Sequence, residues 1–260
     1  MRILVISSRV AAGHVGISAA EPVLHRLGHE VIGLPTVTLS NHPGFPHVAG
    51  ARTEPEVLAA MAQSVLANGW TPDTVLTGYM PSAEAAEVTA DIIAGLTDAR
   101  VVVDPVIGDD PGGLYIAEEA AAKVRDRLVP LADVITPNRF ELAWLTGHDV
   151  ATVGDAFAAA QVLSADVYLT SPPLGDNRTG CLAVSDAAAK LYETETSADV
   201  PHGVGDVFSA LIAAGHDPGR AVGQLARLAQ ASVGAPHLSL TGPDLSWLGA
   251  DAVPGTQVSG

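Results

Sequence analysis

A short glycine-rich motif, Gly203-Val204-Gly205-Asp206, stands directly before an apolar segment, 207–211, that has the composition of a helix start. Two glycines permit a tight turn, and the N–H groups at the positive end of a helix are ready to bind an anion. Asp206 could accept a proton from a substrate hydroxyl while these N–H groups stabilise a phosphoryl group in transfer. An aspartate N-cap after a glycine turn has the same pattern, so the tetrapeptide alone supports both interpretations equally.

Polar residues also follow each predicted strand in the first two thirds of the chain. In open parallel sheets, ligands bind beyond the carboxyl ends of the strands. Each residue on its own is equally typical of caps and turns, but their gathering at one edge favours a binding site. The strand ends are Ser7-Ser8-Arg9, Thr36, Thr77-Gly78-Tyr79, Asp104-Pro105, Thr136-Pro137-Asn138 and Thr170-Ser171.

The elements that position these residues alternate between β-branched runs and segments of helical period, which is typical of a parallel sheet with crossover helices. The predicted strands are 3–6, 31–37, 75–77, 101–104, 134–136 and 167–170, and the predicted helices are 16–27, 55–67, 83–95, 117–128, 139–145, 152–163, 206–214 and 219–233. Residues 181–184 and 190–193 predict two antiparallel strands joined by a turn at Ser185-Asp186. The Gly-, Pro- and Ser-rich segment 236–260 predicts a loose cover or tail. We expect a single domain, 1–260.

Composition limits the partners. The chain has 260 residues with 13 basic and 29 acidic side chains, a formal charge of −16, which argues against a nucleic acid. Its apolar runs are too short for a membrane span or a signal peptide, so we expect a cytoplasmic protein with no membrane partner. The single Cys181 excludes an intramolecular disulfide. Only Lys123 and Lys190 are lysines, so an anionic ligand must be held by arginine, by backbone N–H groups or through a metal.

Two common nucleotide-binding patterns are absent. The chain has no GxxxxGK[ST] loop, and no GxGxxG follows the first strand. The nearest candidate, Gly13-His14-Val15-Gly16, has the wrong spacing, which argues against an NAD-binding Rossmann protein.

Several segments together resemble the pyridoxal kinases of the ribokinase superfamily. They occur in family order between residues 3 and 214, and the S-N-H and T-G-Y segments separate pyridoxal kinases from the sugar and nucleoside kinases. The matching segments are 6–20, Thr36-Val37-Thr38-Leu39-Ser40-Asn41-His42, Thr77-Gly78-Tyr79 with 82–84, 104–109, 135–142 and 203–206.

The resemblance implies a ribokinase-like three-layer α/β/α sandwich, with a mostly parallel central sheet and antiparallel edge strands. It implies ATP-dependent phosphorylation of the 5′-hydroxyl of pyridoxal, with pyridoxine and pyridoxamine as further acceptors, to give pyridoxal 5′-phosphate in vitamin B6 salvage. Mg²⁺ would accompany ATP, with K⁺ where a monovalent cation is used. A homodimer is expected from the family alone.

The family's site residues carry over position by position. Asp206 would be the general base, and Gly203, Val204 and Gly205 would complete the catalytic turn. The pyridoxal pocket would include Ser8, Thr36, Val37, His42 and Tyr79. The ATP side would include Asp104, Asn138, Glu141, Thr170, Ser171 and Gly205, with Asp104 and Glu141 near Mg²⁺, directly or through water, and Thr136 beside a monovalent cation.

Some alternatives remain open. Asn138 and Glu141 have the spacing of a capping box, and Tyr79 and His42 are compatible with ordinary loop packing. Arg9 replaces a residue that is commonly His, and its charge is expected to alter preference among the vitamers. A hydroxymethylpyrimidine kinase is one alternative function. A non-catalytic relative that binds a B6 vitamer is another, suggested by a short nucleotide side.

Overall fold

The computed structural model describes residues 1–186, 188–241 and 245–258. Its centre is a ten-stranded sheet in the order β12-β11-β10-β9-β8-β5-β4-β1-β2-β3. All six predicted strands form its parallel part, because their β-branched side chains pack well on both faces of a buried sheet. These strands are β1 (Arg2–Val10), β2 (Glu30–Leu39), β4 (Thr74–Thr77), β5 (Arg100–Val103), β8 (Val134–Ile135) and β9 (Asp166–Thr170).

Antiparallel strands close both edges of this sheet. β3 (Gly50–Arg52) pairs with β2 at one edge. At the other edge lie β10 (Arg178–Ser185), β11 (Ala188–Glu195) and β12 (Thr256–Val258). The predicted hairpin of 181–184 and 190–193 is confirmed with longer strands, and Cys181 pairs with Tyr192. Of its turn, Ser185 and Asp186 are described, whereas residue 187 lies outside the described residues.

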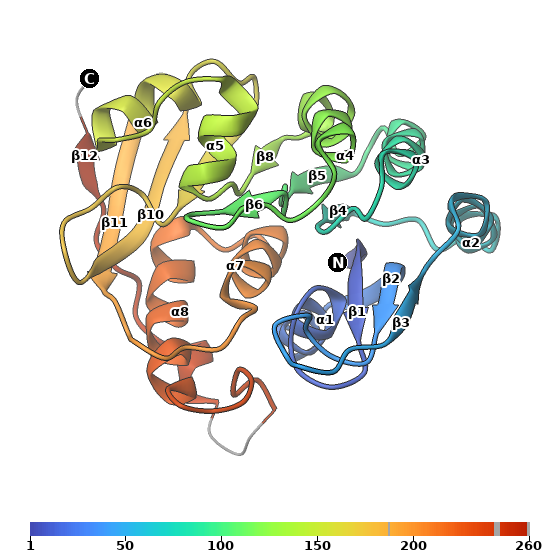
Figure 1. Cartoon of the computed structure of the whole chain (residues 1–260), viewed down its shortest axis with the longest axis horizontal. Helices are drawn as coiled ribbons and strands as arrows, with labels where there is room; N and C mark the ends of the chain where they lie inside the picture. Colours follow the sequence, from blue (N-terminus) through green and yellow to red (C-terminus); the bar gives the residue numbers. More distant parts are fainter. Residues whose placement is uncertain (187, 242–244, 259–260) are drawn as a thin grey trace.

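Helices cover both faces of the sheet, as Figure 1 shows. Each predicted helix is present, and 117–128 continues as one helical segment through a π-helical turn, Val124–Leu128, to a 3₁₀ turn, Val129–Leu131. The helices are α1 (Ile17–Arg26), α2 (Pro55–Ala67), α3 (Ala83–Ala94), α4 (Glu118–Lys123), α5 (Arg139–Thr146), α6 (Val153–Ala160), α7 (Val204–Ala213) and α8 (Pro218–Ser232).

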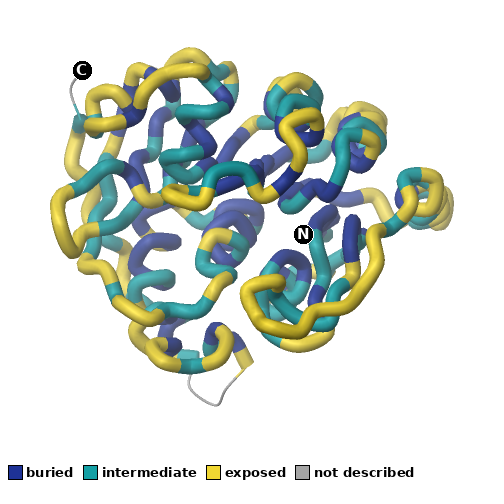
Figure 2. The backbone as a smooth tube through the Cα atoms, in the orientation of Figure 1, coloured by how far each residue is buried: buried dark blue, intermediate teal, exposed yellow. Residues whose placement is uncertain are grey.

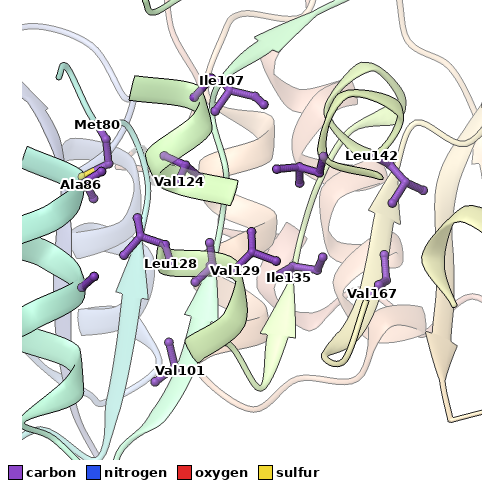
Figure 3. Packing of buried hydrophobic residues seen from close by; sticks show 14 of the residues in the cluster. Met80, Ala86, Val101, Ile107, Val124, Leu128, Val129, Ile135, Leu142 and Val167 are labelled. Carbon is purple, nitrogen blue, oxygen red and sulfur yellow. The ribbon is translucent and has the colours of Figure 1, made fainter. Parts of the chain in front are cut away.

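Two separate cores show that the molecule has three layers. Along β1, Leu4 and Ile6 belong to a core that includes residues of α2 to α6, whereas Ile3 and Val5 belong to a core with α1, α7 and α8. Figure 2 shows the buried strands between helices whose outer sides are exposed, and Figure 3 shows part of the first core. The predicted α/β/α fold class is therefore confirmed.

The segment that follows α8 is not the loose tail that its composition predicted. Leu238, Leu240 and Trp247 are buried in the core of α7 and α8, with Trp247 in a 3₁₀ turn, Ser246–Gly249. β12 then adds to the sheet beside β11. Residues 242–244 and 259–260 of this segment lie outside the described residues.

The hairpin that leads from β5 towards α4 lies outside the large sheet. Its strands, β6 (Gly108–Asp109) and β7 (Gly113–Leu114), are antiparallel. Figure 1 places β6 near α5 and α7, over the centre of the molecule. Within the described ranges, no helix is both long and apolar enough to cross a membrane.

Candidate active site

The turn at 203–206 begins helix α7, and its geometry excludes the interpretation of Asp206 as the N-cap. Gly203 is the N-cap residue with φ of +108°, and no side chain caps this helix. Asp206 is the third residue of the helix, so its carboxylate is not the cap. The first N–H groups of the helix are consequently left for another acceptor.

The two glycines of this turn serve different purposes. A Cβ on Gly203 would lie 2.0 Å from the carbonyl oxygen of His14, so only glycine fits between the turn and the loop that follows β1. A Cβ on Gly205 would meet no atom within 4 Å. Gly205 lines the hollows on either side of the helix start, so it leaves space for a ligand.

Asp206 is half-buried, and the backbone N–H of Gly16 hydrogen-bonds to its carboxylate. Burial raises the pKa of Asp206 to about 6, and the Gly16 hydrogen bond opposes this shift. A carboxylate with this pKa is largely ionised at neutral pH and is still a useful proton acceptor.

Gly16 is a site residue that the sequence analysis missed. Its φ is +56°, and a Cβ there would lie 2.3 Å from Ser8 Oγ and 2.2 Å from Ser8 O. Gly16 therefore holds the end of β1 against Asp206. The signal is present in Gly13-His14-Val15-Gly16, which belongs to the family-matching segment 6–20 but has the wrong spacing for a dinucleotide motif.

A chain of buried hydroxyls connects the strand ends below this turn. Thr136 Oγ1 and Ser209 Oγ are 2.8 Å apart, and Ser209 Oγ donates to Asp104 Oδ2 at 2.8 Å. Burial, and then the charges of Glu141 and Asp206, raise the pKa of Asp104 well above its ordinary value. The predicted metal-side residues Asp104 and Thr136 are thus linked through Ser209, on α7.

Asn138 and Glu141 form a complete capping box at the start of α5, which confirms the structural interpretation of their spacing. Glu141 Oε2 accepts from Asn138 N at 2.8 Å and Oε1 accepts from Ile107 N at 2.9 Å. Burial raises the pKa of Glu141 to about 7 despite these backbone hydrogen bonds. The carboxylate has little capacity left for direct metal coordination, which favours contact through water.

A β-bulge shapes the strand ends on the predicted pyridoxal side. Ser7 pairs with Pro35 and Ser8 with Val37, so Thr36 is an extra residue in β2. Bulges of this kind redirect side chains near functional sites. Thr36 Oγ1 donates to Tyr79 O at 2.8 Å, and Tyr79 N donates to Ser7 Oγ at 3.2 Å. The structure therefore brings Ser8, Thr36, Val37 and Tyr79 together.

His42 lies apart from that group. Its ring stacks on His202 with the centroids 4.0 Å apart, and its Nδ1 accepts from Gly44 N at 3.1 Å. Both rings line a hollow of about 230 Å³ that also includes His14. Burial, and then the neighbouring His202, lower the pKa of His42.

Arg9, whose charge was expected to alter preference among the vitamers, forms an ion pair within the protein. Arg9 Nη2 is 2.8 Å from Glu21 Oε2 of α1, and a Cβ on Gly33 of β2 would lie 3.1 Å from the same nitrogen. The charge of Arg9 is therefore paired on the side of the sheet that α1 covers.

The predicted ATP-side residues line one hollow of about 440 Å³. Its lining includes Asp104, Thr136, Asn138, Glu141, Thr170, Ser171, Gly205 and Asp206, together with Asp109, Asp110, Tyr115 and Arg139. We call this hollow the acidic pocket. The last four residues were not predicted, because they come from the β6–β7 hairpin, from the residue that follows it and from the first position of α5, which lie beyond the strand ends.

An apolar hollow of about 240 Å³ adjoins the acidic pocket, and both share Thr170, Ser171 and Gly205. Helices α7 and α8 contribute most of its apolar side chains, which include Val204, Phe208, Val222 and Leu225. Of these, the sequence analysis named only Val204, as part of the turn. A flat apolar group attached to a phosphate chain would fit this arrangement.

The donor set of the acidic pocket fits a magnesium ion that arrives with a phosphate ligand. In the described part of the chain, no three His, Cys, Asp or Glu side chains converge on a preformed metal site. Mg²⁺ is commonly held by one or two carboxylates together with substrate phosphates and water. Asp104, and Glu141 through water, are suitable for this role.

Comparisons with known proteins agree on one family. The family model described as phosphomethylpyrimidine kinase matches residues 27–235. The chain is 34% identical to pyridoxal kinase PdxY of Corynebacterium diphtheriae over 81% of this chain and 79% of that protein. It is 38% identical to the pyridoxine/pyridoxal/pyridoxamine kinase of Bordetella avium over 80% of this chain and 75% of that protein.

Solved structures of similar proteins share the whole fold. The pyridoxal kinase of Entamoeba histolytica matches with a TM-score of 0.91 and 25% identity over 99% of both chains. The pyridoxal kinase of Leishmania donovani, in complex with ADP and pyridoxine, matches with a TM-score of 0.90 and 28% identity, again over 99% of both chains.

Proposed function

This chain belongs to the phosphomethylpyrimidine kinase family, among its pyridoxal kinases, and from this premise we propose that it transfers the γ-phosphoryl group of ATP to the 5′-hydroxyl of pyridoxal. The products are pyridoxal 5′-phosphate and ADP. Pyridoxine and pyridoxamine are further acceptors, because relatives carry all three names.

The observation that carries the proposal is the position of Asp206 at the uncapped start of α7, beside the open space at Gly205. The hydroxyl oxygen of pyridoxal attacks the γ-phosphorus as its proton passes to Asp206. The bond from phosphorus to the bridging oxygen of ATP breaks, and ADP leaves with the electron pair. The N–H groups of Val204, Gly205 and Asp206 stabilise the negative charge of the transferred group.

The remaining side chains hold the two substrates around this turn. Ser8, Thr36, Val37 and Tyr79 are proposed to position the pyridoxal ring, and Gly16 keeps Ser8 beside the base. Thr170 and Ser171 join the acidic pocket to the apolar hollow, which is proposed to receive the adenine. His42 is proposed to act at the rim, because it lines a different hollow.

Mg²⁺ would neutralise charge on the ATP phosphates. Asp104 and Glu141 would hold it from the protein side, with Asn138 as the neighbouring polar group. Ser209 connects Thr136 to Asp104 by hydrogen bonds. Where a monovalent cation is used, Thr136 would lie beside that cation.

Hydroxymethylpyrimidine is the second candidate acceptor, since the matching family model is described as phosphomethylpyrimidine kinase. The Ser40-Asn41-His42 segment and the named relatives favour the B6 vitamers. The intact catalytic turn argues against a non-catalytic binding protein.

We further propose one kinase domain over 1–260 that acts as a cytoplasmic homodimer. The continuous ten-stranded sheet supports a single domain. The family resemblance supports the dimer. The formal charge of −16 supports the absence of a nucleic-acid partner.

The test is transfer from ATP in the presence of Mg²⁺ and K⁺, read from the absorbance of pyridoxal 5′-phosphate. Pyridoxine, pyridoxamine and hydroxymethylpyrimidine are assayed in parallel by ADP release. Turnover of pyridoxal supports the proposal and ranks the acceptors. A folded protein that phosphorylates only hydroxymethylpyrimidine, or no acceptor, contradicts it.

A further inference from the structure

The acidic pocket presents an electrostatic difficulty for ATP. Five carboxyl groups line it, from Asp104, Asp109, Asp110, Glu141 and Asp206. A triphosphate adds further negative charge to this surface, and metal ions offset only part of it. A cation supplied by the protein would therefore contribute directly to nucleotide affinity.

Arg139 is the only cationic side chain among the described residues that line this pocket. Neither lysine of the chain belongs to the lining. Lys123 is paired with Glu87, and Lys190 lies on β11, in register with Ala183 and Gln257. The resemblance to pyridoxal kinases assigned no role to Arg139.

The start of α5 places Arg139 at the mouth of the pocket. It is the first residue of the helix, directly after the Asn138 cap. Asn138 Nδ2 donates to Gly108 O at 2.8 Å, and a Cβ on Gly108 would lie 2.4 Å from the ring of Phe140. The hairpin and the helix start are therefore packed together, which fixes the base of the Arg139 side chain.

Arg139 is held by an ion pair at an exposed position. Its Nε and Nη2 both donate to Asp110 Oδ2, at 3.0 and 2.7 Å. The side chains of Arg139 and Asp110 are 43% and 46% exposed. Both N–H groups share one oxygen, and exposed ion pairs contribute little net stability. A phosphate can accept the same two N–H groups on two oxygens, which is a stronger arrangement.

We propose that Arg139 binds the phosphates of the nucleotide, and that Asp110 is the counter-ion it exchanges for them. The inference rests on the proposed function, because it assumes that the acidic pocket receives ATP. Asp110 then competes with the nucleotide for the guanidinium, so it weakens ATP binding while it keeps Arg139 in place.

A purely structural role of the ion pair between Arg139 and Asp110 would give a different result for Asp110→Asn. If the pair only fastens the hairpin to α5, loss of either partner breaks the same contact, and Arg139→Gln and Asp110→Asn have the same effect. If Arg139 binds phosphate, Arg139→Gln removes the ligand contact, whereas Asp110→Asn releases the arginine. The two substitutions then change nucleotide affinity in opposite directions.

The experiment measures Mg²⁺–ADP binding by calorimetry and steady-state constants for ATP and pyridoxal in Arg139→Gln, Arg139→Lys and Asp110→Asn. We expect Arg139→Gln to weaken ADP binding and raise KM for ATP about tenfold, the loss of one charge-assisted contact. KM for pyridoxal should change less than about twofold, and Arg139→Lys should recover part of the loss. Asp110→Asn should bind ADP more tightly than the wild type, because the competing carboxylate is removed.

Arg125→Gln is the matched control, because Arg125 forms a comparable exposed pair with Asp126 and does not line the pocket. Equal weakening by Arg139→Gln and Asp110→Asn, or no effect of Arg139→Gln, overturns the inference. If the wild type binds Mg²⁺–ADP but does not phosphorylate pyridoxal, the proposed function fails. The opposite shifts in ADP affinity would still support Arg139 as the phosphate contact.

Discussion

As the proposed general base, Asp206 would have to satisfy two conflicting requirements. It would have to be ionised to accept a proton, yet burial beside the helix start raises its pKa to about 6. The Gly16 N–H and the start of α7 favour the ionised form, and together they leave the pKa just below neutrality. A general base is most effective when its pKa is close to the working pH.

Asp206→Asn is predicted to lower kcat by about 10²–10⁴-fold, the usual contribution of a general base, with pyridoxal and ADP binding retained. In the wild type, kcat/KM should rise with pH through about 6 and then level off, because the carboxylate form is the active one. Steady-state rates from about pH 5 to 8 and calorimetric binding are the measurements. A variant with wild-type kcat would rule out the assignment.

The same pKa shift has a consequence for stability. The folded-state pKa of Asp206 lies above its ordinary value. Its favourable contribution to the free energy of unfolding is therefore present below pH about 4 and is lost as the pH rises through about 6. The side chain of Asp206→Asn stays neutral at every pH. The difference in Tm between this variant and the wild type should therefore favour the variant more at pH 8 than at about pH 4.5. An equal difference in Tm at both values would contradict the raised pKa.

The sequence identifies residues of this site when they follow strands, and it misses those that act through packing. Asp104, Thr136 and Asp206 were found because strand ends and glycine turns have recognisable composition. Gly16 was missed because its role depends on contact with Ser8 and Asp206, which are brought to it by other elements. Arg139 was missed because its neighbour Asp110 comes from a hairpin whose position over α5 cannot be derived from spacing.

The turn that starts α7 depends on glycine in two different ways. Gly203 needs a positive φ and a close approach to His14, whereas Gly205 needs neither. We therefore expect the first glycine to be required for folding and the second for access of the proposed ligand. This distinction could not be read from a motif in which both residues look equivalent.

Gly203→Ala is predicted to destabilise the fold by more than about 1 kcal/mol, because it combines strain at positive φ with a clash. Gly205→Ala should keep the wild-type free energy of unfolding within about 0.5 kcal/mol. It should lower kcat/KM about tenfold or more, because its methyl group would face the proposed phosphate site. Urea unfolding and steady-state rates on both variants separate the two roles. A fully active Gly205→Ala would show that the turn is only structural.

Element prediction succeeded where local composition decides the outcome. The six parallel strands and all the helices follow from apolar periodicity and β-branching. The bulge at Thr36 was not predicted, since the pairing of β1 with β2 is a long-range property. The segment after α8 was misjudged for the same reason. A Cβ on Gly223 of α8 would lie 2.0 Å from Asp251 O. Glycine at this position of the helix therefore makes room for the C-terminal segment, which composition alone predicts to be loosely packed.

The turn at 203–206, which starts α7, belongs to only one of the two cores of the molecule. Phe208 and Leu211 of α7 pack in the core that also contains Leu238 and Trp247. The chain that follows α8 therefore completes the layer that carries Asp206. Stability of this layer should depend on residues far from any ligand.

Trp247→Ala is predicted to destabilise the protein by about 3–5 kcal/mol, because the side chain is 1% exposed and its removal leaves a cavity. Trp247→Phe should cost less, since it keeps most of the volume and removes an indole N–H that has no hydrogen-bond partner in the described structure. Trp70, which is 50% exposed, supplies the control variant Trp70→Ala. Urea midpoints that fall equally for Trp247→Ala and Trp70→Ala would mean that the segment after α8 does not support the layer of the catalytic turn.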